Sequence, residues 1–203
     1  MTKVSIYVEG AGPSKEQQSR CREAFSKLFV KAGFRGRMPR VIPSGSRSAT
    51  FDDFKTAARA VTSEHYPILL VDSEDVVTPA PWDHLRARDG WERPNSVADD
   101  QAQLMVVCME TWVMADQTAL RSCFGASLQA SALLPVSNLE QYSREDVQQA
   151  LEHATRNCGR DRTYRKGNRS FRVVGELDPH TLMTHLPHFK RLIDALDKHL
   201  PGD

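Results

Sequence analysis

The chain has 203 residues, of which 40% are hydrophobic and 26% are charged, and its formal net charge is +1. A chain of this size buries a core without disulfide or metal staples, so we expect one globular domain with a modest appendage. The near-neutral charge excludes a general electrostatic attraction to nucleic acid, and any basic surface must be local.

Membrane and secreted proteins are also disfavoured by the sequence. No apolar run approaches the roughly 18 residues of a membrane helix, and the N-terminus enters a strand pattern without a signal-peptide profile. The four cysteines are widely spaced and form no C-x-x-C pair, which is typical of reduced thiols rather than of disulfides or a zinc site. We therefore expect a cytoplasmic protein with no membrane contact.

Strand and helix patterns alternate along residues 1–120. Short apolar runs rich in β-branched and aromatic residues indicate strands, and apolar stripes at helical spacing indicate helices. Ser14 is expected to cap the first helix, and the second helix is expected to begin near Thr50. In chain order we predict a strand over 3–9, a helix over 15–32, a strand over 38–42, a helix over 51–61, a strand over 67–71, a short helix over 82–88, a strand over 103–109 and a helix over 110–120.

Residues 121–203 are predicted to form a helical extension that packs on this core. Helices are expected over 144–155, 181–186 and 189–200, with a basic loop over 156–172. In the first part of the chain, alternating strands and helices imply right-handed crossovers and a parallel sheet covered by helices. The predicted fold is therefore α/β, with a parallel sheet of about four strands in residues 1–120 and a C-terminal helical extension.

Acidic residues follow three of the predicted strands. Glu9 ends the first strand, Asp72 and Glu74 follow the third, and Glu110 follows the fourth. The carboxyl ends of parallel strands meet at one edge of a sheet, where ligands bind. Clustered carboxylates repel one another unless a cation neutralises them, and they bind hard cations such as Mg²⁺ or Mn²⁺. Taken singly, each acid also suits a turn, a helix N-terminus or a solvated position.

The acidic strand ends belong to an ordered series of short segments. The series comprises Ile6-Tyr-Val-Glu-Gly-Ala-Gly12, Gly36-Arg-Met-Pro-Arg40, Leu69-Leu-Val-Asp-Ser-Glu74, Pro81-Trp-Asp-His-Leu85, Asp99-Asp-Gln-Ala-Gln103, Cys108-Met-Glu-Thr-Trp112, Ala115-Asp116, Tyr164-Arg-Lys-Gly167 and Leu192–Leu196. The strand ending in Glu-Gly and the strand ending in Asp-x-acid resemble the Toprim domain of topoisomerases, primases and overcoming-lysogenization-defect nucleases. The whole series, which spans nearly the entire chain, is more similar to a bacterial Toprim-like family of unknown function that is often associated with phage-defence genes.

The resemblance implies roles for the matching positions. Glu9 corresponds to the Toprim glutamate, which is a metal ligand or general acid/base, and Asp72 and Glu74 correspond to the Asp-x-Asp metal pair. Two positions depart from the pattern. Glu74 replaces an aspartate and is one methylene longer, and Pro13 stands where nuclease-type Toprim domains often carry a second acid.

The position occupied by Pro13 leaves one ligand to be supplied from elsewhere in the chain. Glu110 and Asp116 are the two candidates, and Glu110 is the better one because we expect it at a strand edge. The implied cofactor is Mg²⁺ or Mn²⁺, held by Glu9, Asp72, Glu74 and Glu110.

Residues 156–172 form a basic segment that the total charge conceals. The segment contains six Arg and one Lys against one Asp. Lys166 is the candidate for a phosphate-contacting catalytic lysine, because the glycine after it lets the backbone approach closely. Tyr164 and Phe171 are interleaved with the charges and are expected to stack on bases, although a solvated arginine-rich loop remains the alternative. The residues expected to bind nucleic acid are Arg47, Arg160, Arg162, Arg165, Lys166 and Arg169.

The long loop after the third strand carries Trp82 and Trp91 on either side of His84. A loop of this length in a compact domain is often functional. It suits a lid or a substrate platform, but packing of the tryptophans against the sheet edge is the favoured interpretation.

Together these features favour a metal-dependent nuclease of the Toprim class, a hydrolase of DNA or RNA phosphodiesters in phage defence, with Glu9, Asp72 and Lys166 as catalytic residues. The alternative is a non-catalytic Toprim-like binding or regulatory subunit of a partner ATPase, since the chain itself has no G-x-x-x-x-G-K-[ST] loop. A phospho-acceptor receiver domain ranks third, because Glu9 is followed by Gly10-Ala-Gly rather than by further acids. The sequence leaves the oligomeric state open.

Overall fold

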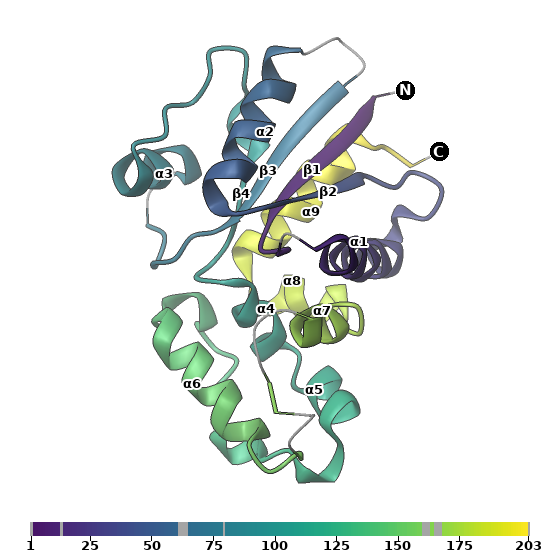
Figure 1. Cartoon of the computed structure of the whole chain (residues 1–203), viewed down its shortest axis with the longest axis vertical. Helices are drawn as coiled ribbons and strands as arrows, with labels where there is room; N and C mark the ends of the chain where they lie inside the picture. Colours follow the sequence, from purple (N-terminus) through teal and green to yellow (C-terminus); the bar gives the residue numbers. More distant parts are fainter. Residues whose placement is uncertain are drawn as a thin grey trace.

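The computed structural model describes residues 2–12, 14–60, 65–78, 80–159, 163–164 and 168–202, and at 168 and 169 the backbone alone. Within these ranges the centre of the molecule is a four-stranded parallel sheet in the order β2-β1-β3-β4 (Figure 1). The strands are β1 Lys3–Glu9, β2 Arg40–Gly45, β3 His65–Asp72 and β4 Ala102–Met105. The predicted α/β fold, with a parallel sheet of about four strands and C-terminal helices, is confirmed for this part of the chain.

The register of the sheet brings the ends of β1 and β3 side by side. Val8 of β1 lies opposite Leu70 of β3, and Asp72 of β3 lies opposite Met105 of β4. Between Val8 and Glu9 the pairing with β2 shifts by one residue, so that Glu9 lies opposite Gly45. Every residue from Pro67 to Asp72 is buried, as expected for a central parallel strand covered on both faces.

Helices cover both faces of this sheet. The helices of the described ranges are α1 Lys15–Phe29, α2 Arg47–Arg59, α3 Pro81–Asp89, α4 Met109–Ala115, α5 Gln117–Phe124, α6 Arg144–Thr155, α7 Asn168–Val174, α8 Pro179–His185 and α9 Pro187–His199, and only some of them cover the sheet. α2 packs on the face that carries Tyr7, whose ring meets Phe54 edge-on at a centroid distance of 6.5 Å. α1 and α9 lie on the other face (Figure 1), and Trp112 of α4 joins them through edge contacts with Phe25 and Phe189.

Short helical turns connect these elements. η1 Val30–Phe34 is a π turn, and η2 Asp99–Gln101, η3 Gly125–Ser127, η4 Ala130–Ala132 and η5 Leu139–Gln141 are 3₁₀ turns. The π turn ends the first helix, because Gly33 within it has a φ of 94°, which glycine adopts at little cost. At the other end of α1, the predicted cap is confirmed, since the Ser14 hydroxyl accepts a hydrogen bond from the Gln17 N–H at 3.1 Å.

Capping side chains explain two of the boundaries that differ from the prediction. α2 begins at Arg47 rather than near Thr50, because the Ser46 hydroxyl caps it by accepting from the Ala49 N–H at 3.3 Å. Thr50 lies inside the first turn, where its hydroxyl donates to the Ser46 carbonyl at 2.8 Å. The helix predicted over 110–120 is broken between α4 and α5, because the Asp116 carboxylate caps α5 by accepting from Ala119 N–H at 2.9 Å.

The chain beyond residue 120 both extends away from the sheet and returns to it. α5 and α6 form the lower part of the view in Figure 1, whereas α7 and α9 lie closer to the sheet. α7 packs against α1 and α9 against β4, where Arg191 Nη1 donates to the Ala102 carbonyl at 2.6 Å. No helix in the described ranges combines the length and apolar character needed to cross a membrane.

Candidate functional site

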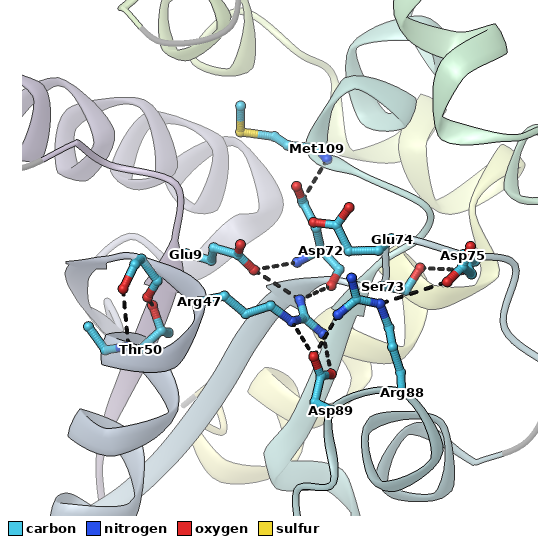
Figure 2. Close-up of polar contacts among 12 residues, drawn as sticks. Glu9, Arg47, Thr50, Asp72, Ser73, Glu74, Asp75, Arg88, Asp89 and Met109 are labelled. Atoms are coloured by element: carbon cyan, nitrogen blue, oxygen red, sulfur yellow. Dashed lines mark hydrogen bonds and ion pairs between the residues drawn. The ribbon is translucent and has the colours of Figure 1, made fainter.

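Glu9 and Asp72 lie next to each other at the carboxyl-terminal edge of the sheet. Glu9 is the last residue of β1 and Asp72 is the last residue of β3. The backbone N–H of Asp72 donates to Glu9 Oε2 at 3.3 Å (Figure 2). The convergence of these two acids follows from the parallel pairing of their strands, as the sequence predicts.

Arg47 lies between the acids of this edge. Its Nη1 donates to Glu9 Oε2 at 3.1 Å and also to the backbone carbonyl of Asp72. Its Nε and Nη2 donate to the two carboxylate oxygens of Asp89 at 3.0 and 2.7 Å. The Arg47 side chain is only 15% exposed, because α2 begins immediately after β2 and directs its first residue across the ends of β1 and β3.

The charges of this group are fixed by their mutual contacts. Burial lowers the pKa of the Arg47 guanidinium, but the hydrogen bond to Asp89 and the charges of Glu9 and Asp89 outweigh it and raise that pKa above its usual value. Burial raises the pKa of Asp89, but the hydrogen bond and charge of Arg47 and the charge of Arg88 lower it overall. We call Glu9, Arg47, Asp72 and Asp89 the carboxylate edge; when all four are ionised, three carboxylates and one guanidinium give it a formal charge of −2.

The carboxylate of Asp72 points toward the start of α4. Its Oδ1 accepts a hydrogen bond from the backbone N–H of Met109 at 2.9 Å, and the residue is 4% exposed. A buried carboxylate held by a backbone donor has little rotational freedom. Its position relative to Glu9 is therefore set by the sheet and by the loop between β4 and α4.

The side chain of Glu74 pairs with a residue of another element. Its backbone is in the left-handed region, with a φ of 69°, and its N–H donates to the Val107 carbonyl at 2.7 Å. Its carboxylate forms an ion pair with Arg144, the first residue of α6. Among the described residues, no group of three or more His, Cys, Asp or Glu side chains is arranged to hold a metal ion.

Glu110 lies in the protein interior. The predicted strand over 103–109 ends at Met105, so that Glu110 falls in the first turn of α4 rather than at a strand end. Its Oε1 accepts a hydrogen bond from the Tyr164 hydroxyl at 3.0 Å, and its Oε2 is buried without a hydrogen-bond partner among the described residues. Burial and the neighbouring Glu110 raise the pKa of Tyr164 well above its usual value. The predicted role of Glu110 as a metal ligand stays a prediction.

Asp116, the other candidate for the missing ligand, is occupied by backbone contacts. Besides capping α5, it accepts a hydrogen bond from the Asp178 N–H through Oδ2 at 2.8 Å. These bonds join α5 to the start of α8, which is a structural role.

Most of the predicted nucleic-acid-binding residues lie outside the described part of the chain. These are Arg160, Arg162, Arg165 and Lys166, and for Arg169 only the backbone, within α7, is described. Tyr164 and Phe171 are described and are only 3% and 2% exposed. The prediction that these two rings stack on nucleic-acid bases is therefore wrong, because both are packed in the core.

The two tryptophans after β3 are packed, as the sequence favoured, but against helix α2 rather than against the sheet edge. The Trp91 ring stacks on Phe51 with a centroid distance of 4.1 Å, and the Arg47 guanidinium lies 5.0 Å above the Trp91 ring. Trp82 is buried against Phe54. The loop thus supports one face of Arg47 and leads into the site.

Sequence reasoning missed Asp89 and Arg144, the two partners that hold Arg47 and Glu74. Asp89 is the last residue of α3 and precedes Gly90. An acid at a helix C-terminus is disfavoured by the helix dipole, which is a signal that this side chain has a cationic partner elsewhere. Arg144 has a comparable signal, since it is a cation in the first turn of α6.

Comparison with known proteins identifies a family over nearly the whole chain. Residues 8–197 match the model of a domain of unknown function, DUF4276. No curated protein and no solved structure matches the chain.

Proposed function

The chain belongs to the DUF4276 family, and we propose that it is a metal-dependent nuclease of the Toprim class, cleaving DNA or RNA phosphodiesters in the cytoplasm as part of phage defence. The observation that carries the proposal is the hydrogen bond from the Asp72 N–H to the Glu9 carboxylate. It joins the last residues of two adjacent parallel strands at one edge of the sheet. In parallel α/β sheets this edge is where ligands bind.

The donors of the carboxylate edge suit Mg²⁺ or Mn²⁺. Both cations prefer carboxylate oxygens, and Mg²⁺ is commonly held by one or two carboxylates while waters and substrate phosphates complete its shell. Glu9 and Asp72 supply two such carboxylates. Glu74 would join them as a ligand only if its ion pair with Arg144 opened.

Within this proposal each residue has a distinct task. Mg²⁺ bound at such a site supplies Lewis-acid polarisation of the phosphodiester and a bound water of lowered pKa. Asp72 is oriented by the Met109 N–H and presents a carboxylate of fixed direction. Glu9 presents a carboxylate that accepts from the Asp72 N–H, and Arg47 partly neutralises the charge of Glu9. Lys166 is the proposed phosphate-contacting lysine.

A second candidate is a non-catalytic Toprim-like subunit that regulates a partner ATPase. It is favoured by the cation already present at the site, since Arg47 pairs with Glu9 and Arg144 pairs with Glu74. A site whose acids are neutralised by the protein's own arginines is able to keep its shape without a metal.

Titration with Mg²⁺ or Mn²⁺ and cleavage of labelled DNA and RNA separate the candidates. We expect Glu9→Gln and Asp72→Asn to weaken cation binding at least about tenfold, since even residues behind the ligands contribute that much, and to abolish cleavage. Glu23→Gln is the matched control, because Glu23 is exposed on α1 and pairs with Lys27. Wild-type cleavage in both edge variants would refute the proposal, whereas cation binding without any cleavage would favour the regulatory subunit.

A further inference from the structure

The hydrogen bonds of the Arg47 guanidinium fall into two groups, one to Asp89 and one to Glu9 and Asp72. A guanidinium has five N–H groups, and four of those of Arg47 are used within the described residues. Nε and Nη2 form a bidentate pair with Asp89. Nη1 donates once to Glu9 Oε2 and once to the carbonyl of Asp72.

The side of the guanidinium that pairs with Asp89 is held by contacts that do not involve Glu9 or Asp72. Asp89 is 11% exposed, ends α3, and also accepts a hydrogen bond from Arg88 Nη1 at 2.6 Å. Trp91 lies against one face of the guanidinium. Bidentate pairing of this kind sets both the position and the plane of an arginine. Arg47 would therefore keep its position if the Glu9 carboxylate bound a cation instead of Arg47.

The Nη1 side of the guanidinium donates to the Glu9 carboxylate and to the backbone carbonyl of Asp72, the two acids proposed to bind the cation (Figure 2). We propose that Arg47 couples cation binding to phosphate binding, with Asp89 as the positioning residue that holds it. If Glu9 served as a ligand of a divalent cation, the Nη1 N–H that Glu9 now accepts would be able to donate to an oxygen of the substrate phosphate instead. This inference rests on the proposed function and adds to it an order of binding and a residue outside the predicted site.

Two physical arguments support the direction of this coupling. A charged N–H in a largely buried position is costly without an acceptor, so its loss of Glu9 favours a phosphate oxygen in its place. The formal charge of −2 repels a phosphate before the cation binds, and a divalent cation removes that repulsion. Because coupling between two ligands is reciprocal, the phosphate ligand should in turn tighten the binding of the cation.

The coupling is measured as the ratio of two dissociation constants of the full-length chain. Short fluorescein-labelled single-stranded DNA and RNA serve as probes, each titrated by anisotropy with Mg²⁺ and with chelator, and Mg²⁺ affinity is measured by calorimetry. For the wild type we expect the probe to bind about tenfold more tightly with Mg²⁺, within the usual range for coupled sites. For Asp89→Asn we expect this ratio to fall below about threefold, and the affinity for Mg²⁺ alone is measured beside it because the variant also removes a negative charge from the carboxylate edge.

Three further variants make the result specific to Arg47 and its anchor. Asp83→Asn is the matched control, because Asp83 lies on the same helix and pairs with Arg86 in an exposed position; it should keep the wild-type ratio. Asp89→Glu restores the carboxylate and should recover part of the ratio. Arg47→Lys keeps the charge but loses the fork that Asp89 holds, and it should lower the ratio as Asp89→Asn does.

The outcomes distinguish failure of this inference from failure of the proposed function. A wild-type ratio in Asp89→Asn, or equal weakening of both ligands in that variant, would overturn the coupling alone. A wild type that binds Mg²⁺ but neither probe would count against the coupling and the nuclease together. If the wild type binds no Mg²⁺, or if Glu9→Gln leaves Mg²⁺ affinity unchanged, the proposed function fails first and the coupling with it.

Discussion

The two ends of β3 hold buried charge in opposite ways. At the amino end, the carboxylate of Asp100 accepts hydrogen bonds from Tyr66, Lys198 and His199, so one acid has several donors. At the carboxyl end, the guanidinium of Arg47 is shared by Glu9 and Asp89, and Arg88 also pairs with Asp89. The first arrangement has donors in excess and fastens the C-terminal helix to the sheet. The second has acids in excess, so we expect an added cation to bind at this end.

The largest expected effect is at the carboxyl end. Replacing Arg47 with methionine leaves Glu9 and Asp89 partly buried without their shared cation, and loss of one partner of a buried pair costs about 3 kcal/mol or more. Urea unfolding at neutral pH measures this. Excess Mg²⁺ should raise the stability of Arg47→Met more than that of the wild type. A ligand stabilises the state that binds it, and in the variant Glu9 no longer pairs with Arg47.

Arg20→Met is the control for this substitution. Arg20 pairs with Glu16 on the exposed surface of α1, and such pairs contribute roughly 0–1 kcal/mol. If the two methionine variants had equal stability, the contrast between the ends of β3 would lose its energetic basis.

A smaller effect is expected at the amino end, where it depends on pH. Burial raises the pKa of Asp100, but the hydrogen bonds from Lys198, Tyr66 and His199 outweigh it and lower the pKa from 3.8 to about 2. Because the folded-state pKa is depressed, the stabilisation is complete above pH 3.8 and is lost as the pH falls toward 2. Its size is about 2 kcal/mol.

Comparison of wild type and Asp100→Asn by urea unfolding across this acid range tests that effect. The stability difference between the two proteins should shrink as the pH falls from about 5 to about 2, because the pKa is lowered from 3.8 to about 2. A difference that stays constant over this range would mean that the Asp100 carboxylate does not carry the fastening.

The smallest expected effect concerns the backbone of Glu74. A left-handed conformation costs a residue with a side chain roughly 1–2 kcal/mol relative to glycine. Glu74→Gly and Glu74→Ala both lose the ion pair with Arg144, so their difference isolates the backbone. We expect the glycine variant to be more stable by about 1 kcal/mol, measured by urea unfolding. Greater stability of the alanine variant would show that the turn relaxes and that the strain is not retained.

Strand-end reasoning predicted the core of the site because it depends only on strand order. Glu9 and Asp72 each end an apolar run, and parallel pairing of those runs brings the two acids together. The contacts that govern these acids were not predictable in the same way. Arg47 and Asp89 are 42 residues apart in sequence and meet only because the start of α2 and the end of α3 converge on one edge of the sheet.

Burial was predicted less well than position. Tyr164 stands in an arginine-rich segment, a pattern typical of an exposed stacking residue, yet it is 3% exposed. Its hydroxyl finds a partner in Glu110, and a buried tyrosine requires such a partner. Single-sequence patterns do not reveal a buried acid that satisfies a distant hydroxyl.

The ion pair between Glu74 and Arg144 makes the charge of the site depend on where α6 lies. With the pair closed, Glu74 adds nothing to the carboxylate edge; with α6 displaced, one more negative charge would face it. The affinity of the protein for Mg²⁺ would then report the position of a helix that makes no contact with the cation. We expect Arg144→Met to bind Mg²⁺ more tightly than the wild type does, and equal affinities in calorimetry would show that the site is insulated from α6.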